Sequence, residues 1–386
     1  MPDNSIDFGH LFQLARRQEL SDIDSEDLNA AESRLLDELK SLQARIQTFD
    51  SEPKPQPEFD FARLLQRLRF PLESASPNPA TADLDSSLQD EIPAQIGDYE
   101  IRESIGRGGC ADVYRAHHRL LHQDFAIKAI RTSENPVSLE RFQREMRVIA
   151  ALRCPHVITA TDAREQDDRL YLVTEFVDGI TLSQLIQQQG PLPVGHACEL
   201  VRQTCSGLRV IHKLGIVHRD LKPSNLMINR DAIVKILDLG LVSLRGADNT
   251  FTEGSLPATS LTSASHLMGT VDYVSPEQID DARIADARSD FYSLGCVLHF
   301  LLTGQVPFPT SLYPSKIARL IAHQAVSADA VDQIRVDVPS PVVELVSSLL
   351  QKNPDDRPSK ASEIMDQLAP HCSSIDLTKL SWFNVA

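Results

Sequence analysis

The sequence predicts an α+β fold with two lobes, a small strand-rich lobe followed by a larger helical one. Short runs that alternate apolar and polar residues, the pattern of strands, dominate from Gly97 to about residue 178. Beyond Gly179, apolar residues recur three and four positions apart, which is the pattern of helices. An acidic segment precedes both parts. Strands first and helices afterwards favour two lobes, and the cleft between two lobes is a natural ligand site.

Length and composition place the chain among ordinary globular proteins. Its 386 residues are 42% hydrophobic, which suffices for one large core or two smaller ones. The six cysteines form no Cys-x-x-Cys pair, so a zinc site or a disulfide framework is disfavoured and a reducing compartment is favoured. No apolar run approaches the ~20 residues needed to cross a bilayer, and the opening Met-Pro-Asp-Asn does not resemble a signal peptide. We therefore expect a cytoplasmic protein without a membrane span.

The net charge of -16 is concentrated in the first quarter of the chain. Residues 1–95 hold 19 acidic and 9 basic side chains, so they carry -10 of that charge. Such a chain repels a phosphate backbone at long range, and we expect no nucleic-acid partner. Within this extension, the apolar spacing predicts an amphipathic helix from about Asp27 to Phe49, and a Pro/Ser-rich linker follows over Pro71 to Asp90. We interpret residues 1–95 as a low-order tail, with docking of a partner as the alternative.

The small lobe, residues 96–178, is predicted to contain strands and one helix. The helix, Ser138–Ala151, has its apolar side chains on one face. The strands are predicted over Tyr99–Ile105, Val113–His117, Asp124–Ile130, Val157–Thr161 and Leu170–Val177.

The large lobe, residues 179–370, is predicted to be mainly helical, and residues 371–386 are predicted to be a tail. One strand is expected over Ile233–Leu237. The helices are predicted over Leu182–Gln189, Val194–Leu214, Asp290–Leu302, Ser315–Gln324, Pro341–Gln351 and Lys360–Leu368.

A glycine-rich segment lies between the first two predicted strands. It reads Gly106, Arg107, Gly108, Gly109, Cys110, Ala111, Asp112 and Val113. Glycines let backbone N–H groups approach phosphate oxygens closely, because no Cβ stands in the way. A strand follows at Val113 where a dinucleotide-binding fold would have a helix, so that fold is disfavoured. By itself the segment is as well explained by a hairpin turn that binds no nucleotide.

Lys128 and Glu145 form a second candidate for phosphate chemistry. Lys128 lies on the third predicted strand, and a lysine that points into the cleft neutralises phosphate charge if an acid holds its stem. Glu145, in the following predicted helix, is placed to be that acid. Taken singly, each residue is more often a solvated surface charge.

The most informative segment runs from His218 to Asn225 and reads His-Arg-Asp-Leu-Lys-Pro-Ser-Asn. Asp220 is suited to accept a hydroxyl proton, and Lys222 is close enough to counter charge on a transferring group. Asp238 follows the strand predicted next, in Asp-Leu-Gly. Asn225 and Asp238 offer oxygen ligands, which magnesium prefers.

With this segment the sequence resembles the eukaryotic-like (Hanks-type) serine/threonine protein kinases, and its loop details resemble the bacterial branch. The resemblance covers residues 99–368, about 70% of the chain, with the motifs in family order. It implies the bilobal protein kinase fold, with a small β-rich N-lobe, a larger helical C-lobe and the low-order acidic extension in front. It also implies ATP and Mg²⁺ as cofactors and proteins with Ser/Thr acceptors as substrates.

The resemblance assigns roles to the candidate residues. Lys128 would contact the α and β phosphates and pair with Glu145, and Asp220 would orient and deprotonate the substrate hydroxyl. Asn225 and Asp238 would hold magnesium. The ATP site would be formed by Ile105, Gly106, Arg107, Gly108, Gly109, Cys110, Ala111, Asp112, Val113, Ala126, Lys128, Glu175 and Val177.

Three further positions are implied by the same resemblance. Thr174 would be the gatekeeper before the hinge, where the backbone of Glu175 and Val177 would read the adenine edge. Glu277, in Ser-Pro-Glu, would pair with Arg357, and Asp290 would brace the catalytic loop, which is the segment from His218 to Asn225.

The stretch between Asp238 and Glu277 is rich in hydroxyl groups, and we expect activation by phosphorylation there, with Arg219 available to bind the phosphate. Its acceptors are Thr250, Thr252, Ser255, Thr259, Ser260, Thr262, Ser263, Ser265 and Thr270.

The chain departs from the family pattern at Ala111, Leu239 and Ser275, none of which removes a group that does chemistry. Lys222 and Thr270 favour serine and threonine over tyrosine as acceptors. The main alternative is a pseudokinase scaffold, which predicts the loss of at least one of the residues Lys128, Asp220, Asn225 and Asp238. A small-molecule phosphotransferase would usually lack the Ser-Pro-Glu element and its arginine partner.

Overall fold

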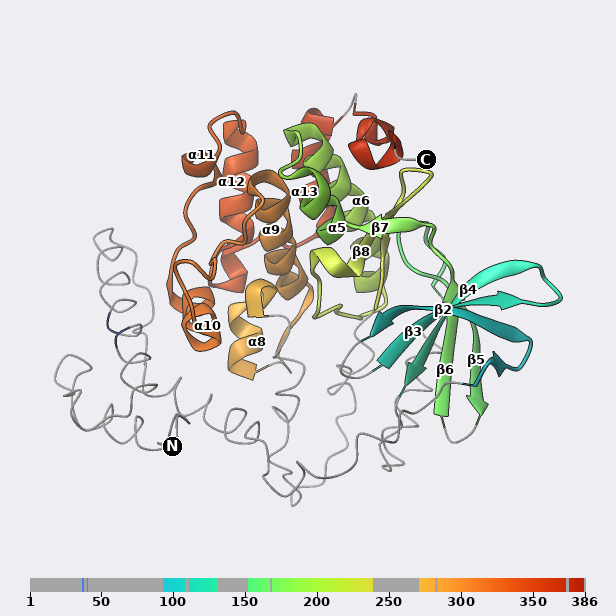
Figure 1. Ribbon diagram of the computed structural model, residues 1–386. Helices are drawn as coiled ribbons and strands as arrows, with labels where there is room; N and C mark the ends of the chain where they lie inside the picture. The colour runs from blue at the N-terminus through green and yellow to red at the C-terminus, as the bar shows by residue number, and fades with distance from the viewer. Residues whose placement is uncertain are drawn as a thin grey trace, which may run out of the picture.

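A computed structural model describes residues 93–107, 111–130, 152–166, 169–238, 271–281, 284–372 and 375–384, together with Asp37 and Lys40. The described chain forms two lobes: a twisted sheet lies on one side and most of the helices lie on the other (Figure 1). The α+β, two-lobed prediction is confirmed. The predicted helices Asp27–Phe49 and Ser138–Ala151 lie outside the described residues, apart from Asp37 and Lys40, which are helical.

The small lobe contains a six-stranded antiparallel sheet with the order β1-β2-β3-β4-β6-β5. One face of this sheet holds a compact cluster that includes the buried rings of Tyr99, Phe125 and Tyr171. The strands are β1 Gln95–Ile96, β2 Tyr99–Arg107, β3 Ala111–His118, β4 Gln123–Ile130, β5 Ala160–Gln166 and β6 Arg169–Glu175.

The predicted strand Val157–Thr161 was wrong, because the strand of the structure, β5, covers Ala160–Gln166. β5 is an edge strand in which only Ala160 is buried, and the residues after it alternate between exposed and half-buried. Its charged side chains give no run of apolar residues from which to predict a strand. The apolar residues before it bond to another strand instead: the Ile158 N–H donates to the carbonyl oxygen of Ile236 (2.9 Å).

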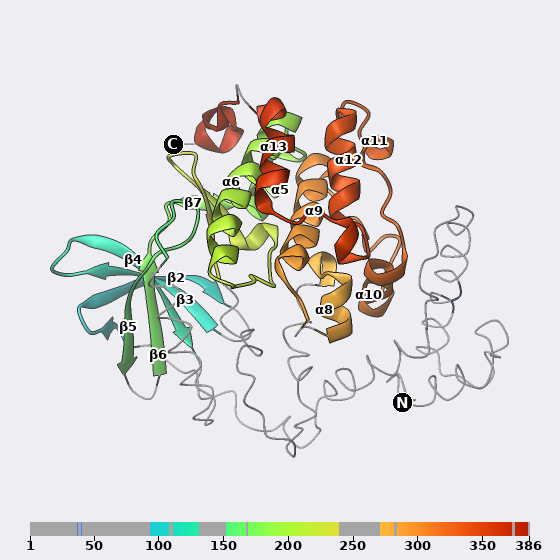
Figure 2. The same cartoon turned by 180° about the vertical axis from the view of Figure 1, so that it is seen from behind.

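The large lobe contains the predicted helices, with ends that shift by a few residues, and two short helices that were not predicted, α8 and α11. Its helices are α5 Leu182–Gln189, α6 Val194–Lys213, α8 Pro276–Asp281, α9 Ala287–Thr303, α10 Lys316–Ala325, α11 Val331–Ile334, α12 Ser340–Leu349 and α13 Ala361–Cys372. Helix α13 packs along α6 (Figure 2). None of the helices within the described residues is long and apolar enough to span a bilayer.

A three-stranded antiparallel sheet with the order β7-β8-β9 packs into the core of the large lobe. Its strands are β7 Gly179–Thr181, β8 Leu226–Asn229 and β9 Val234–Ile236. Thr181 ends β7 and caps the next helix, since its hydroxyl accepts from the Gln184 N–H while the Gln184 side chain bonds back to Thr181.

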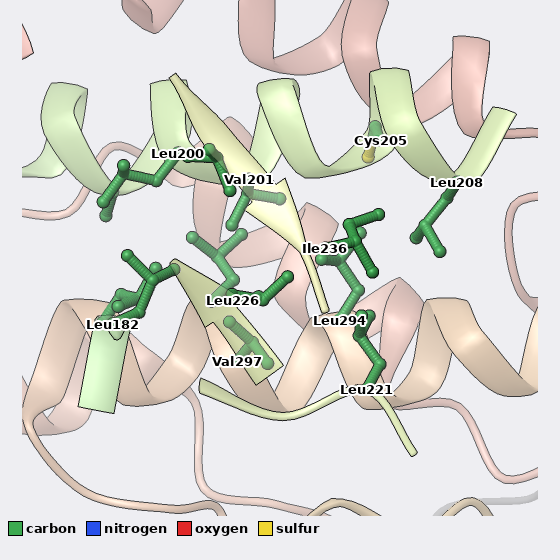
Figure 3. Close-up of a cluster of buried hydrophobic side chains, with 14 of the residues drawn as sticks. Leu182, Leu200, Val201, Cys205, Leu208, Leu221, Leu226, Ile236, Leu294 and Val297 are labelled. Carbon is green, nitrogen blue, oxygen red and sulfur yellow. The ribbon is translucent and has the colours of Figure 1, made fainter. Parts of the chain in front are cut away.

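The main core fixes β8 and β9 against the helices. Leu226 and Ile236 are fully buried, and Figure 3 shows them between the helices that carry Val201 and Val297. Burying each such side chain stabilises the fold by about 2 kcal/mol. The buried strands therefore fix the positions of the residues next to them, Asn225 before β8 and Leu237 after β9.

The described part of the predicted tail packs against the large lobe. Leu377, Leu380 and Trp382 are buried in the main core cluster. The Arg230 guanidinium lies over the Trp382 ring, 4.5 Å from its centre. Residues 375–384 are thus part of the folded lobe.

Candidate active site

The antiparallel pairing of β8 and β9 brings Asn225 and Asp238 to the same end of the small sheet. Leu226 is opposite Ile236 in the register, so the residue before β8 meets the residues after β9. The Leu237 N–H donates to the carbonyl oxygen of Asn225 (2.8 Å). Two predicted metal ligands that are distant in sequence are thus neighbours.

The Asp220 carboxylate accepts hydrogen bonds from two predicted site residues. Lys222 Nζ lies 2.8 Å from Oδ2 and 3.1 Å from Oδ1, and Asn225 Nδ2 lies 3.0 Å from Oδ2. Asn225 Nδ2 also donates to the Asp220 carbonyl oxygen (2.8 Å). The Asp220 side chain remains 40% exposed, so a solvent-borne substrate can reach it.

His218 connects the catalytic loop, to which Asp220 belongs, to the segment that follows β9. Its Nδ1 accepts from the Asp220 N–H (3.3 Å), so the proton of the neutral ring is on Nε2. Nε2 therefore donates to the carbonyl oxygen of Leu237 (2.9 Å). The buried ring fixes the distance between the catalytic loop and the segment that holds Asp238.

Asp290, in the first turn of α9, holds the catalytic loop through hydrogen bonds, as the family resemblance implies. Its carboxylate is fully buried and accepts from the backbone N–H groups of His218 (2.8 Å) and Arg219 (2.8 Å). His212 Nε2 is 2.7 Å from the same carboxylate. These bonds hold Arg219 in a left-handed backbone conformation (φ 64°), which is costly for a residue with a side chain.

Lys128 reaches the site from the small lobe. Residues on alternate positions of β4 share a face, so Lys128 and Ala126 point the same way, opposite to the buried Ile127. Lys128 Nζ lies 2.7 Å from Asp238 Oδ1 and thus joins the two lobes. Its predicted partner Glu145 lies outside the described residues.

The predicted nucleotide site is partly described. Ala126 is opposite Thr174 on the neighbouring strand, and Gly106 is opposite Val113. Ile105 is 46% exposed at the end of β2. Asp112 on β3 is opposite Arg107 in the strand register. Glu175 is the last residue of β6, and Val177, two residues later, is buried. Gly108, Gly109 and Cys110 lie outside the described residues, as do the side chains of Arg107 and Ala111.

Glu277 at α8 forms the predicted pair with Arg357: Nη1 lies 2.7 Å from Oε1 and Nη2 lies 2.9 Å from Oε2. Burial raises the pKa of Glu277, but the hydrogen bonds and charge of Arg357 and the Ser289 hydroxyl outweigh it, so the pKa lies below its ordinary value. Residues 239–270, with the predicted phosphorylation sites, lie outside the described residues.

Two contacts of this region were not predicted. Gln278 Nε2 donates to the carbonyl oxygen of Arg219 (2.8 Å), which joins α8 to the catalytic loop. Arg319 on α10 lies 3.0 Å from Asp272. Burial raises the pKa of Asp272, although Arg319 opposes this shift. The Gln after Ser-Pro-Glu was the available sequence signal for the first contact, whereas the second had none.

The sequence of residues 99–369 matches the family model of the protein kinase domain. The chain belongs to the protein kinase domain family. Membership implies an ATP site, and of the residues that the family pattern predicts around it, Lys128 of the small lobe contacts Asp238 of the large lobe.

Several curated relatives of this kinase domain are bacterial. The serine/threonine-protein kinase PknB of Mycolicibacterium smegmatis is 36% identical over 285 residues, which cover 72% of this chain and 43% of that protein. The probable serine/threonine-protein kinase PknB of Lactococcus lactis is 34% identical over 278 residues, covering 71% of this chain and 42% of that protein. The chain therefore spans less than half the length of these relatives.

Among solved structures, the kinase domain is similar to Rad53 1-466 in complex with AMP-PNP. The TM-score is 0.56 at 28% sequence identity, and the match covers 71% of this chain and 65% of that chain. This similarity agrees with the bilobal protein kinase fold, a small β-rich lobe and a larger helical lobe.

Proposed function

We propose that this protein is a serine/threonine protein kinase that transfers the γ-phosphate of ATP to Ser/Thr hydroxyls of protein substrates. One observation carries the proposal: Lys128 of the small lobe contacts Asp238, Lys222 and Asn225 contact Asp220, and the backbone bond from the Leu237 N–H to Asn225 links the two sets. The relatives named as serine/threonine kinases support the same activity.

Asp220 would act on the acceptor hydroxyl. Its carboxylate is partly exposed and is oriented by Lys222 and Asn225, so it is available to accept the proton as the oxygen attacks phosphorus. Lys222 would also stabilise negative charge on the phosphoryl group in transit. His218 and Asp290 would keep this geometry in place before substrate arrives.

Asn225 and Asp238 fit a magnesium site. Asn225 donates through its Nδ2 to Asp220, which leaves its amide oxygen for a cation. Asp238 adds carboxylate oxygens from the adjacent strand end, and hard oxygen ligands are those that magnesium prefers. Bound magnesium would neutralise charge on the phosphate oxygens.

Gly106 supports close approach of a phosphate group. A Cβ at this position would meet only Val113, at 3.7 Å and 3.9 Å, so packing within the described protein does not require glycine. The backbone there is not left-handed either, since Gly106 is absent from the glycines with positive φ. A ligand that approaches the backbone explains the glycine.

The adenine end of the site would be formed by Ile105, Val113 and Ala126, with the backbone of Glu175 and Val177 along one edge. We further propose that Thr174 leaves room behind the adenine and that loop phosphorylation activates the enzyme. For residues 1–95, docking of a partner is the alternative to a tail without such a role. A cytoplasmic location belongs to the same proposal.

The test incubates the full chain with Mg-ATP and a Ser/Thr peptide library and maps phosphates by mass spectrometry. We expect phosphoserine and phosphothreonine in wild type and none with Asp220→Asn. ATP binding without phosphate on the chain or the peptides would instead support the pseudokinase alternative. Phosphate only on a small-molecule acceptor would support the phosphotransferase alternative.

A further inference from the structure

Glu175, the last residue of β6, is bonded through both its backbone and its side chain to the segment before β5. Its N–H donates to the carbonyl oxygen of Thr159 (3.0 Å). Its Oε1 accepts from the N–H of the same Thr159 (2.9 Å). Because these bonds hold both ends of the residue, the direction of its peptide group is fixed.

Lys235, the middle residue of β9, holds the same carboxylate from the large lobe. Its Nζ lies 2.9 Å from Glu175 Oε1 and 2.9 Å from Oε2, although 60 positions separate the two residues. The Lys235 side chain is 12% exposed and that of Glu175 is 31% exposed, so water screens this pair less than it screens a pair at the open surface.

The backbone of β9 is tied to the segment that contacts Glu175. The Ile236 N–H donates to the carbonyl oxygen of His156 (3.0 Å), and the Ile158 N–H donates to the carbonyl oxygen of Ile236 (2.9 Å). Residues 156–159 therefore lie between the end of β6 and β9 and bond to both. The Lys235 side chain joins the end of β6 to β9 directly. Lys235 lies three residues before Asp238, which follows the end of β9.

We propose that Lys235 is a positioning residue for nucleotide binding: it holds the Glu175 carboxylate and thereby fixes the backbone of residues 175–177 relative to Asp238. The inference rests on the proposed function, since it takes these two places as the two ends of the ATP site. Lys235 itself touches neither the nucleotide nor the reacting hydroxyl. The competing explanation is an ion pair that affects stability alone.

The test replaces Lys235 by methionine, which keeps an apolar stem and removes the ammonium group. The dissociation constant of Mg-ATP is measured by calorimetry on the full chain, and KM for ATP and kcat are measured on the same preparations. We expect Lys235→Met to raise the Kd and KM for ATP about tenfold, with kcat within about twofold of wild type. Lys235→Arg should restore most of the affinity.

A double-variant cycle and a matched control separate positioning from general stability. The double variant Glu175→Gln/Lys235→Met should have a Kd for ATP no higher than that of the single variant with the higher Kd, because both substitutions remove the same Lys235–Glu175 interaction. The control is Arg202→Met, which removes another half-buried pair, Arg202 to Glu199 (2.7 Å), from α6. It should leave the ATP affinity unchanged.

An unchanged Kd in Lys235→Met, with only a lower unfolding temperature, would overturn the inference, and so would an equal loss of affinity in Arg202→Met. A wild-type chain that binds ATP but transfers no phosphate would refute the proposed function, while the Kd comparison would still decide the role of Lys235. A wild-type chain that does not bind ATP would overturn both.

Discussion

Arg357 and Glu277 form a two-pronged ion pair that is almost fully buried and spans 80 positions of the chain. The guanidinium also donates to the carbonyl oxygens of Gln351 (2.7 Å), Arg288 (3.0 Å) and Lys352 (2.9 Å). It therefore joins α8, which contains the Pro and Glu of the Ser-Pro-Glu element, to the segment between α12 and α13.

Arg357→Met should destabilise the protein strongly, because it leaves the Glu277 carboxylate buried without its cation. We expect the free energy of unfolding to fall by about 3–5 kcal/mol in urea titrations. The matched control is Arg335→Met: Arg335 pairs with the exposed Asp337 but also donates to two backbone carbonyls. The prediction fails if the control loses as much stability as Arg357→Met.

The pH dependence of stability should include a contribution from Glu277. Burial raises the pKa of Glu277, but Arg357 and Ser289 lower it by more, so its pKa falls below the ordinary value and the folded protein binds this proton less tightly than the unfolded chain does. The stabilisation is therefore complete above the ordinary pKa of about 4.3 and is lost as the pH falls through the lowered folded value.

We expect the difference in unfolding free energy between wild type and Glu277→Gln to shrink from about pH 5 to about pH 3. Chemical denaturation at several pH values measures it. A difference that stays constant over this range would contradict the assignment.

Asp238→Asn should nearly abolish phosphate transfer. The substitution keeps the shape of the side chain and removes the charge that would hold magnesium, so turnover should fall at least about a thousandfold, with a smaller loss of nucleotide affinity. Steady-state kinetics and calorimetry measure the two effects. Unchanged turnover would refute the metal assignment.

Lys128→Met should lower turnover by at least about a hundredfold and leave the fold intact, because the ammonium group would be lost from the phosphates. Circular dichroism monitors the fold. Lys360→Met, at an exposed lysine just before α13, is the control and should behave as wild type. Wild-type activity in Lys128→Met would reject the phosphate role.

Two glycine substitutions should affect different properties, one the stability of the fold and the other the binding of ATP. A Cβ at Gly179 would lie 2.2 Å from the carbonyl oxygen of Ile228, so Gly179→Ala should cost about 1–3 kcal/mol of stability. Gly106→Ala has room within the protein, and it should preserve the unfolding temperature but weaken ATP binding. Thermal unfolding and calorimetry on both variants check this, and a destabilised Gly106→Ala would contradict it.

The residues with a distinctive chemical context were predictable from sequence. Asp220, Asn225 and Asp238 occur in short motifs. The antiparallel pairing of β8 and β9, which lie between the last two, explains why those two meet. The pairing of Glu277 with Arg357 came from the family resemblance, and the structure confirms it.

Other contacts left no local signal. Lys235 is a charged residue within an apolar strand, and nothing near it in sequence points to Glu175. The edge strand β5 was misplaced because its polar side chains give no run of apolar residues. Arg319 and Asp272 are distant in sequence and come together only because α10 packs beside the Ser-Pro-Glu segment. Long-range packing, which no single segment encodes, decided these cases.

The carboxylate of Asp290 has a consequence for how such an enzyme is controlled. Asp290 lies on α9 of the large lobe, and its carboxylate accepts hydrogen bonds from the backbone N–H groups of His218 and Arg219. The conformation of the catalytic loop is therefore fixed when the large lobe folds. Nucleotide binding would then have no need to organise Asp220, the proposed proton acceptor. A switch between inactive and active forms would then have to change the access of ATP or of the protein substrate to this loop, for example through the position of the small lobe.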